Sequence, residues 1–481
     1  MKNLDSDKKI SSRDENFSAW YQEIIDVADL AEHGPVKGTM IIKPYGYSIW
    51  ENVRNILDKE FKDLGVQNAY FPMFIPESFL KKEESHVEGF SPEVAVVTYA
   101  GGKKLQEALI IRPTSETIIY DAFSRWVNSY RDLPVVINQW ANVVRWELRP
   151  RLFLRTTEFL WQEGHTAHAT YEEADDFART MLNVYKKFAE DYLAIPVILG
   201  VKSDSEKFAG AVQTYTVEAM MQDGKALQCA TSHNLGQNFS KVFNVSFNKE
   251  DSTSDYVWQT SWGLSTRIIG ALIMVHSDDI GLVLPPKVAP IHVVIVPVWN
   301  KEVDKERVTA KALEVKNDLI SKIGLSVNLD TSDLHAGEKY YYWEKRGIPI
   351  RIEIGPRDLE NESAVVVRRD TGTKENIKFT LLNERVKSLL IEIQSNLYGR
   401  ALEFRNNKIK EVNTWKDFVK EIEAGNFISA HWSGEKTTEE EIKEKTKATI
   451  RCIPFSEKES EGKCILSGKP SHKRVIFARA Y

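Results

Sequence analysis

The sequence contains few cysteines and no long apolar run. Three cysteines occur among its 481 residues, Cys229, Cys452 and Cys464, and no two of them form a CxxC pair. An odd number without this spacing argues against a disulfide framework and against a zinc site of four thiolates. The longest apolar runs, such as 268–275 and 293–298, are far shorter than the roughly 20 residues of a transmembrane helix. We therefore expect reduced thiols and no transmembrane helix.

The N-terminus also lacks an apolar stretch, because residues 1–16 mix Lys, Asp and Glu. A secretory signal needs an apolar region there, so we expect a cytoplasmic protein. The formal net charge of -5 argues against a surface coated with phosphate-binding side chains, although a local basic groove is compatible with it. With 42% hydrophobic and 28% charged residues, the chain has enough apolar content for two or three packed domains.

Changes in the hydrophobic pattern divide the chain into a polar N-terminal tail and three domains, with predicted ranges 1–16, 17–285, 286–400 and 401–481. The first domain is rich in Trp and Tyr and ends at Pro285-Pro286. In the second, a strand pattern at 291–298 precedes a helix pattern that Gly324 ends, which indicates a compact α/β domain. The third is highly charged and closes on an apolar and aromatic tail, 475–481, which we expect to dock on the rest of the protein.

Arginines stand where they could bind an anion in separate parts of the first domain. Arg145 ends an alternating strand pattern, and Arg155 and Phe159 follow a polar loop, so we expect a hairpin that carries two arginines toward one pocket. Arg267 stands in the first turn of an apolar helix, where free amide groups also favour anions. A guanidinium can clamp a phosphate or a carboxylate, and an aromatic ring can stack on a nucleobase. The alternative for each arginine is a structural role, as a surface ion pair or a helix anchor.

A further segment combines a helix and a strand. A helix pattern follows Ser48, which with Glu51 is placed for a capping box, and the pattern stops near Gly65. A short strand pattern at 69–71 then runs into Pro72. A core helix and an edge strand are the structural alternative for this segment.

In this order and spacing, these segments resemble the three signature motifs of the class II aminoacyl-tRNA synthetases. Motif 1 corresponds to 65–72, motif 2 to 145–159 and motif 3 to 263–267. More specific matches, over nearly the whole chain, resemble the prolyl-tRNA synthetases of the archaeal and eukaryotic type. These matches are RPTSE (112–116), EFLWQEGHTAH (158–168), EKFAGA (206–211), ATSHNLGQNFS (230–240), SWGLSTR (261–267) and IEIGPRDLE (352–360).

The resemblance implies an α+β fold. Its parts would be a class II catalytic domain with an antiparallel sheet, an α/β anticodon-binding domain and a small α+β C-terminal domain. The implied enzyme activates proline with ATP and Mg²⁺ to prolyl-adenylate, transfers the prolyl group to the 3′ end of tRNA(Pro), and releases AMP and pyrophosphate. Motif 1 builds a twofold interface in this family, so we also expect a homodimer.

The resemblance also assigns roles to residues of the catalytic domain. The implied catalytic residues are Arg145 at the carboxylate and α-phosphate, Arg155 at the outer phosphates and Arg267 at the γ-phosphate. The other residues implied for ATP are Glu147 at the adenine amino group, Phe159 stacked on adenine, Gln228 and Thr231. Those implied for proline, besides Arg145, are Thr114 and Glu116 at the ammonium, Trp161, Glu163 and Phe208 around the ring, and His233. His165 and His168 are interpreted as packing residues.

In the second domain, the isoleucines of 350–354 are expected to face inward, so that Arg351 and Glu353 face outward, where single-stranded bases could be read. The resemblance places Glu344, Arg351 and Arg357 near the anticodon. For Arg368 and Arg369, contact with phosphate and a position at a solvated strand edge are equal alternatives.

The sequence departs from the family at two places. Where family members often carry four zinc-binding cysteines, it has Ser433, Thr438, Cys464 and Ser467. One thiolate cannot hold a structural zinc, so we predict a C-terminal domain without it. The long editing insertion of bacterial-type relatives has no room between Phe159 and Trp262, which predicts a separate trans-editing protein for mischarged tRNA.

Two other functions compete with this interpretation. The first is a class II enzyme for threonine, serine, glycine or histidine, against which the segments around 114–116 and Phe208 argue. The second is a catalytically silent paralogue that binds RNA or a partner enzyme. The retention of Arg145, Arg155 and Arg267 argues against it, because a silent copy needs no set of phosphate clamps.

Overall fold

One large sheet connects the first and last parts of the chain. The computed structural model describes residues 10–84, 93–299 and 301–481. The centre of this eleven-stranded sheet is antiparallel and comes from the first predicted domain. Its strands are, in spatial order, β9 (Val197–Val201), β10 (Gln213–Met220), β11 (Ala226–Gly236), β14 (Trp258–Ser265), β8 (Glu158–His168) and β7 (Val135–Val144). The short β3 (Gln67–Asn68) pairs in parallel with β7 at one edge.

Helices cover one face of this sheet. Phe61 of α2 (Pro44–Asp63) and Phe177 of α5 (Tyr171–Lys187) pack edge-on against Trp262 of β14. Tyr185 of α5 donates a hydrogen bond to Gln162 of β8 at 2.5 Å. Because side chains alternate along a strand, the neighbours of Gln162 on β8 must point to the opposite face, which the two helices leave open.

The second predicted domain has its own five-stranded sheet. Its order is β16 (Val327–Leu329), β15 (Val293–Pro297), β17 (Ile350–Ile354), β18 (Ser363–Arg368) and β19 (Lys374–Lys378). The first three strands are parallel and the last two are antiparallel. Its helices are α8 (Glu302–Ile323), α9 (Ala336–Lys345) and α10 (Pro356–Glu360). The predicted helix that Gly324 ends is confirmed, because this glycine adopts φ +67 at the C-terminus of α8.

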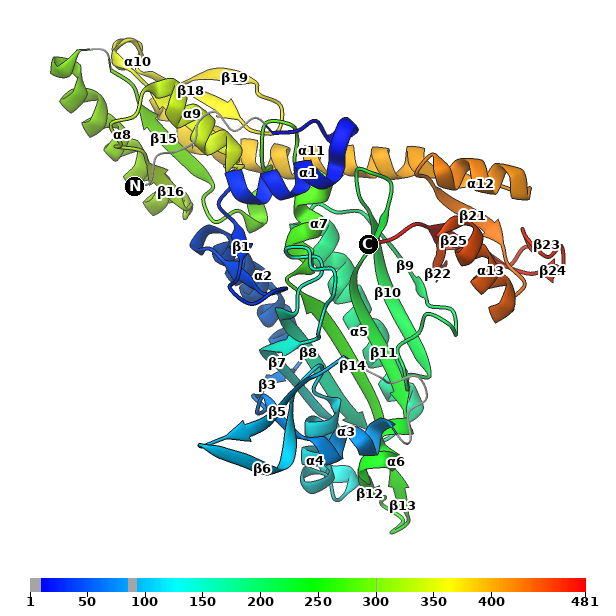
Figure 1. The fold of residues 1–481 in the computed structure, drawn as a ribbon. Coiled ribbons are helices and arrows are strands. Elements are labelled where there is room, and N and C mark those ends of the chain that lie inside the picture. Colours follow the sequence, from blue (N-terminus) through cyan, green and yellow to red (C-terminus); the bar gives the residue numbers. More distant parts are fainter. Residues whose placement is uncertain (1–9, 85–92, 300) are drawn as a thin grey trace.

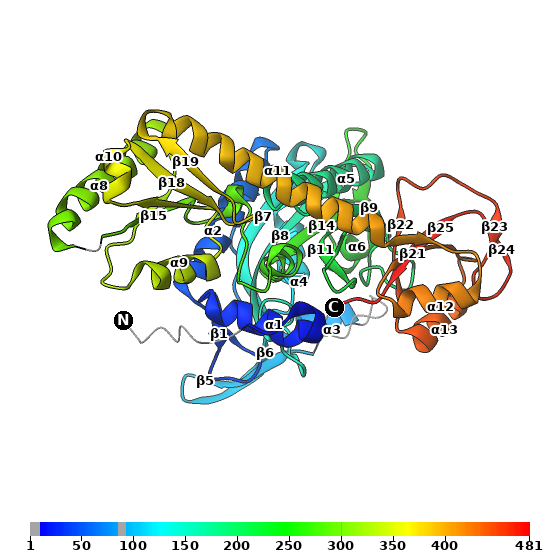
Figure 2. The ribbon, with the colours of Figure 1, turned by 90° about the horizontal axis from the view of Figure 1, so that it is seen from above.

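The 27-residue helix α11 (Leu382–Lys408) passes from this second domain over the large sheet to the C-terminal domain (Figures 1 and 2). The C-terminal domain then extends the large sheet beyond β9. Its strands are β22 (Thr449–Pro454), β25 (Arg474–Ala478), β21 (Phe427–His431) and β20 (Ile409–Glu411), and its helices are α12 (Trp415–Glu423) and α13 (Lys436–Thr446). The predicted α+β architecture of three successive parts is therefore confirmed.

Smaller elements complete the fold. Within the first domain they are α1 (Arg13–Val27), β1 (Ala31–His33), β2 (Met40–Ile42), β4 (Phe74–Pro76), α3 (Glu77–Glu84), β5 (Ala95–Ala100), β6 (Lys103–Ile111), α4 (Glu116–Trp126), α6 (Asn238–Phe243), β12 (Ser246–Asn248), β13 (Ser254–Tyr256) and α7 (Arg267–His276). The hairpin β23 (Gly462–Lys463) and β24 (Pro470–Ser471) lies in the C-terminal domain. None of the helices in the described ranges is long and apolar enough to cross a membrane.

The start of α2 differs from its prediction. The helix begins at Pro44, and Ser48 lies inside it with its hydroxyl donating to the Pro44 carbonyl at 3.0 Å. Proline favours the first helical position because its φ is already helical and its missing N–H is not needed there. The predicted capping box of Ser48 and Glu51 is therefore wrong, whereas the predicted stop near Gly65 is confirmed.

The first and last residues that the structure describes, Ile10 and Tyr481, both pack on the first domain. Residues 1–9 of the predicted polar tail lie outside the described residues, Ile10 is buried, and α1 begins at Arg13. At the other end, the backbone N–H of Tyr481 donates to the Ala226 carbonyl at 3.1 Å, and its hydroxyl donates to Asp223 at 2.6 Å. The predicted docking of the aromatic tail is thus observed.

A buried ionic cluster joins the C-terminal domain to the catalytic sheet. Glu218 of β10 accepts hydrogen bonds from Lys202 at 2.8 Å and from Arg451 of β22 at 3.0 to 3.2 Å. The Glu218 side chain is fully buried. Burial alone would raise the pKa of Glu218, but the positive charges of Lys202 and Arg451 lower it to about 2.

Replacing Glu218 by glutamine should destabilise the fold, because it leaves two buried cations without their counter-charge. The expected loss is about 3–5 kcal/mol of unfolding free energy, measured by urea denaturation at neutral pH. The pKa of Glu218 in the folded protein lies below the ordinary pKa of a glutamate. The stabilisation that Glu218 provides is therefore complete above the ordinary pKa and is lost as the pH falls toward 2. The difference between wild type and variant should shrink over the same interval. Lys59→Met, which removes an exposed ion pair with Asp63, is the control and should leave the denaturation midpoint unchanged.

Candidate active site

A pocket opens on the uncovered face of the large sheet. Strands β8, β10, β11 and β14, the start of α4 and the first turn of α7 all contribute to its wall. Most residues that the sequence assigned to ATP or proline line it. They are Thr114, Glu116, Arg145, Phe159, Trp161, Glu163, Phe208, Gln228, Thr231, His233 and Arg267.

The predicted hairpin forms from β7 and β8, and it brings the arginines together. Arg145 follows β7, donates from Nε to the Pro113 carbonyl at 2.9 Å, and lies 5.5 Å from the ring centres of Phe159 and Trp161. Its side chain is exposed and lines the pocket. Surrounding protein atoms partly desolvate the guanidinium, which lowers the pKa of Arg145, and the negative charges of Glu116 and Glu163 oppose that effect.

Arg267 begins α7, as the sequence predicts, and its Nε donates to the Leu154 carbonyl at 3.1 Å. Desolvation lowers the pKa of Arg267, and so do the positive charges of Arg145 and Arg155. The positive charges of Arg145 in the pocket and of Arg155 beside it therefore repel that of Arg267. A polyanion bound there would relieve this repulsion.

Two predicted residues do not line the pocket but lie beside it. Arg155 is half exposed, and its Nε lies 3.6 Å from a carboxylate oxygen of Glu147. Its charge nevertheless acts on Arg267 inside the pocket. Arg155 and Glu147 thus form an ion pair next to the other two arginines, from which either could turn toward a ligand.

The pocket wall also carries two buried carboxylates. Glu116 accepts a hydrogen bond from Thr114, and Glu163 accepts from Ser115 and from Gln139, the latter at 2.6 Å. Burial raises the pKa of Glu116, and the charge of Glu163 adds to this rise. Burial would also raise the pKa of Glu163, but the hydrogen bond and charge of His165 lower it. The site therefore presents negative charge beside the Arg145 guanidinium.

His165, interpreted from the sequence as a packing residue, also lines this pocket. Its Nε2 lies 3.2 Å from Glu163, and its Nδ1 lies 3.0 Å from the Tyr120 hydroxyl. The signal that could have found it is the period of two along β8, because Trp161, Glu163 and His165 occupy alternate positions of one strand face. Further lining residues that the sequence reasoning missed are Glu206, Thr214, Ser261 and Gly263.

The remaining histidines differ in their surroundings. His168 is buried, its ring lies 5.5 Å from that of Phe177, and burial lowers its pKa to about 4. His233 lies 4.8 Å from the Phe208 ring, and its Nδ1 is 3.0 Å from the Thr214 hydroxyl. Burial and the charge of His165 lower the pKa of His233 to about 3, so at neutral pH it is an uncharged hydrogen-bonding group.

A second cavity lies between the catalytic and second domains. Glu344 and Arg351 line it, whereas Arg357 is exposed on α10 and does not. Arg351 is only 6% exposed, so the expectation that it faces outward is wrong. Tyr340 of α9 covers it, with the guanidinium 4.2 Å from the ring centre, and Glu344 pairs with it at 2.6 Å. Arg369 is neither at a solvated edge nor free for phosphate, because both of its terminal nitrogens bond Asp278 at 2.7 Å.

The positions expected from the zinc-binding pattern converge in the C-terminal domain. The Ser433 hydroxyl lies 3.1 Å from that of Thr438, and hydrogen bonds from Ser467 and Ser433 lower the pKa of Cys464 although burial opposes this. Hydroxyl groups are poor zinc ligands, and one thiol does not complete a site. In the described part of the chain, no cluster of three or more His, Cys, Asp or Glu side chains could hold a metal ion. These residues therefore do not fit a structural zinc.

Comparisons with known proteins agree with this division of the chain. Residues 99–276 match the tRNA synthetase class II core domain (G, H, P, S and T), 292–389 match an anticodon binding domain, and 415–481 match the prolyl-tRNA synthetase C-terminal domain. A relative from Phocaeicola vulgatus, named proline–tRNA ligase, is 55% identical and covers 98% of this chain and 99% of its own. Relatives of the same name from Porphyromonas gingivalis and Chloroherpeton thalassium are each 54% identical over 98% of this chain.

The chain belongs to the prolyl-tRNA synthetase family. Identity at this level over the whole length excludes a family for threonine, serine, glycine or histidine. The relatives named here are all bacterial, so they do not support the qualifier "archaeal and eukaryotic" that the sequence motifs suggested.

Proposed function

We propose that this protein activates proline with ATP to prolyl-adenylate and transfers the prolyl group to the 3′ end of tRNA(Pro), with AMP and pyrophosphate as the other products. The observation that carries the proposal is the place of Arg145. It lines the same pocket as the cation Arg267 and the carboxylates Glu116 and Glu163, and its charge interacts with all three. The substrate carboxylate must meet the α-phosphate at such a point.

Each group then has a chemical task. Attack of the proline carboxylate on the α-phosphate brings two anions together, and Arg145 offsets their repulsion. Arg267 and Arg155 hold the outer phosphates and stabilise the departing pyrophosphate, with Mg²⁺ that arrives with ATP. Phe159 stacks on adenine and Glu147 accepts from its amino group, while Gln228 and Thr231 complete the nucleotide site.

The proline end has a polar and an apolar side. Thr114 and Glu116 bind the secondary ammonium, and Glu163 adds negative charge behind it. Trp161, Phe208 and the neutral His233 enclose the ring. The indole N–H of Trp161 is buried and has no hydrogen-bond partner among the residues that the structure describes, so it is available to a ligand.

Exchange of labelled pyrophosphate into ATP, measured with each of the twenty amino acids, tests this function. We expect exchange that depends on proline and requires Mg²⁺. Exchange with another amino acid alone would contradict the specificity. Binding of ATP and proline without any exchange would instead indicate a silent paralogue.

For the second domain, we propose that the cavity beside Glu344 and Arg351 receives an anticodon base. Support comes from the free edge of the Glu344 carboxylate, whose side chain is 34% exposed, and from Thr371 and the backbone at Gly372 in the same wall. Single-stranded bases are read by such hydrogen-bonding groups. Arg357, on the surface of α10, would contact the neighbouring RNA backbone.

We further propose that the C-terminal domain folds without zinc. Its hydroxyl-rich cluster replaces the metal with hydrogen bonds, and the hydrophobic core around Phe418, Ile442 and Phe477 supports the domain. Elemental analysis of the purified protein should find far less than one zinc per chain, and treatment with a chelator should leave the thermal midpoint unchanged. One tightly bound zinc per chain would refute the proposal.

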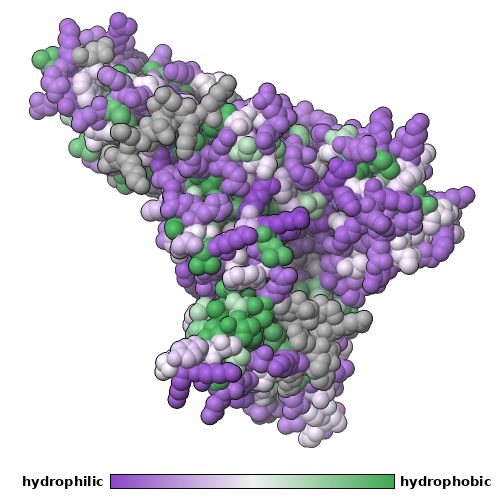
Figure 3. All heavy atoms as spheres, in the orientation of Figure 1, coloured by the Kyte–Doolittle hydropathy of each residue, from purple (hydrophilic) through white to green (hydrophobic). Residues whose placement is uncertain are grey.

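The oligomer is proposed to be a homodimer, which the exposed apolar side chains near motif 1 support. Tyr70 and Tyr99 are 73% and 63% exposed, and Phe74 and Val96 almost half. Figure 3 shows apolar side chains gathered on this part of the catalytic domain. A patch of this kind on one chain suits a self-complementary interface. The mass in solution should correspond to two chains.

The absence of a long insertion between Phe159 and Trp262, together with the matched C-terminal domain, supports an architecture of the archaeal and eukaryotic type in a chain with bacterial relatives. We therefore propose that mischarged alanyl-tRNA is hydrolysed by a separate protein, and that this enzyme alone deacylates none.

The compartment that we propose is the cytoplasm. For the domain boundaries we propose 17–285, 286–400 and 401–481, with α11 spanning the last of these divisions.

A further inference from the structure

The cavity that we assign to the anticodon is built partly by the catalytic domain. Asp278 and Ile280, which follow α7, line it together with Glu344 and Arg351. Arg369 binds Asp278 through both terminal nitrogens at 2.7 Å, and its Nε donates to the Glu344 carbonyl at 2.9 Å. The Arg369 side chain is 5% exposed. One buried guanidinium thus ties a residue of the cavity wall to the end of the motif 3 helix.

The backbones of the two domains also meet closely at this joint. The Leu282 N–H donates to the Lys345 carbonyl at 3.0 Å. A Cβ atom on Gly281 would lie 2.5 Å from the Lys345 Cα, and one on Gly347 would lie 2.6 Å from the Leu282 carbonyl oxygen. Glycine is therefore required on both sides of the contact. A joint this tight transmits a displacement because it has no room to absorb one.

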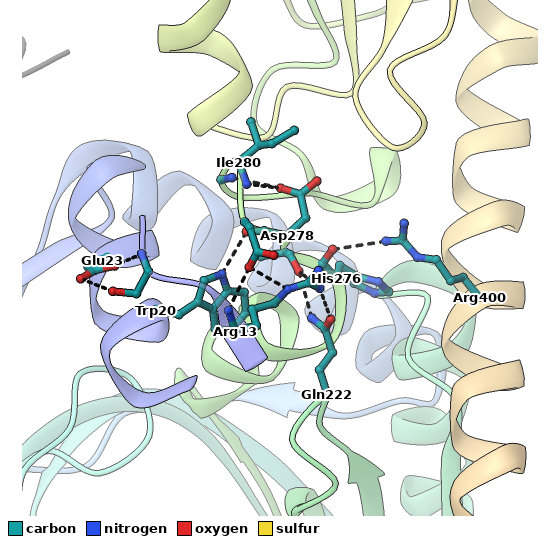
Figure 4. A network of polar contacts seen from close by, with 12 residues as sticks. Arg13, Trp20, Glu23, Gln222, His276, Asp278, Ile280 and Arg400 are labelled. Atoms are coloured by element: carbon teal, nitrogen blue, oxygen red, sulfur yellow. Dashed lines mark hydrogen bonds and ion pairs between the residues drawn. The ribbon is translucent and has the colours of Figure 1, made fainter. Parts of the chain in front are cut away.

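Helix α7 is held at its C-terminal end by side chains from three other elements, which Figure 4 shows around Asp278. Arg13 and Gln222 donate to the Ser277 carbonyl at 3.2 and 2.9 Å, and Trp20 donates to the Asp278 carbonyl at 2.9 Å. Arg400 of α11 donates to the His276 carbonyl at 3.3 Å. These donors satisfy carbonyls that a helix end leaves unpaired, and the arginines also match the negative end of its dipole.

The other end of α7 is Arg267. Ten helical residues span about 15 Å, so the single helix α7 separates the Arg267 guanidinium from the cavity. Every residue from Ile268 to Met274 is buried. The helix can therefore shift only as a unit, together with Arg267.

We propose that Asp278 and Arg369 are positioning residues that couple occupation of the Glu344 cavity by an RNA base to the placement of Arg267 in the ATP pocket. A base bound at Glu344 acts on the carbonyl that Arg369 contacts, and Arg369 passes the change to Asp278 and α7. The reaction would then respond to the anticodon in its rate as well as in its affinity. This inference rests on the proposed function.

The test compares tRNA(Pro) with its own anticodon and a transcript with one anticodon base replaced. For each tRNA, the dissociation constant and the charging rate at saturating tRNA are measured with the wild type, Asp278→Asn and Arg369→Lys. In the wild type the replacement should lower both affinity and rate. In Asp278→Asn the rate penalty should shrink at least about fivefold, the lower range of typical coupling between sites, while the affinity penalty stays.

Arg369→Lys keeps the charge but loses the bidentate contact with Asp278. We therefore expect a rate penalty between those of the wild type and Asp278→Asn. Asp318→Asn in α8 is the control, because Asp318 bonds the exposed Lys322 and neither Arg369 nor a residue that holds α7. It should retain the wild-type rate penalty. The coupling is overturned if Asp278→Asn and Arg369→Lys both keep the full rate penalty of the replaced anticodon base. It is also overturned if the two variants lose the affinity penalty to the same extent as the rate penalty, because Asp278 and Arg369 would then only shape the cavity. Equal losses in tRNA-free pyrophosphate exchange and in charging would also overturn it. Failure of the proposed function itself is distinguishable, because wild-type exchange with proline would then be absent.

Discussion

Replacing Arg145 by alanine is expected to lower kcat/KM for proline-dependent pyrophosphate exchange roughly 100- to 1000-fold, the usual effect of removing one preorganised donor from a transition state. In the proposed reaction Arg145 faces both reacting anions, and its guanidinium lies 5.5 Å from the ring centres of Phe159 and Trp161. The loss should appear in kcat as well as in KM, because charge develops at this point during the reaction.

Two further variants sharpen this result. Arg145→Lys keeps a positive charge but not the planar fork, so it should recover only a small part of the activity. Arg149→Ala removes an exposed arginine of the same loop that does not line the pocket, and it should leave exchange within about twofold of wild type. A loss of less than tenfold in Arg145→Ala would remove Arg145 from the catalytic role.

The Glu116→Gln variant should raise KM for proline about 100-fold and leave KM for ATP nearly unchanged. Truncating one partner of a buried, hydrogen-bonded charge pair typically costs enough binding energy for such a change. Glu116 lies in the pocket wall next to Thr114 and is not among the charges that act on Arg267. Steady-state exchange with varied proline and varied ATP separates the two KM values. Glu158→Gln, which changes an exposed carboxylate at the start of strand β8, is the control.

The pH dependence of the same variant gives an independent check. The pKa of Glu116 is raised by burial, and in the proposed function its charged form binds the ammonium. Proline affinity in the wild type should therefore be full above this raised pKa and should fall as the pH drops through it. The glutamine variant should lose this dependence. A wild-type profile that is flat over the acidic range would contradict the role of Glu116.

Much of the candidate site could be predicted from the sequence motifs, because each motif consists of residues that are close together in the chain. Glu116 two residues after Thr114, and the alternating Trp161 and Glu163, reach the pocket by the geometry of a helix start and of a strand. His165 obeys the same alternation. Its place in the pocket wall was not predicted, because a single sequence does not indicate which strand face is covered by helices and which is open.

Periodicity alone determined that Arg351 lies on the side of β17 opposite the isoleucines, that Gly324 ends a helix, and that Arg267 begins one. Only the tertiary structure decided what lies against those sides. Tyr340 buries Arg351, and the turn after α7 brings Asp278 to Arg369, through contacts between segments far apart in the chain. A strand or helix pattern depends on neighbours along the sequence, whereas burial and pairing depend on what the fold places across from them.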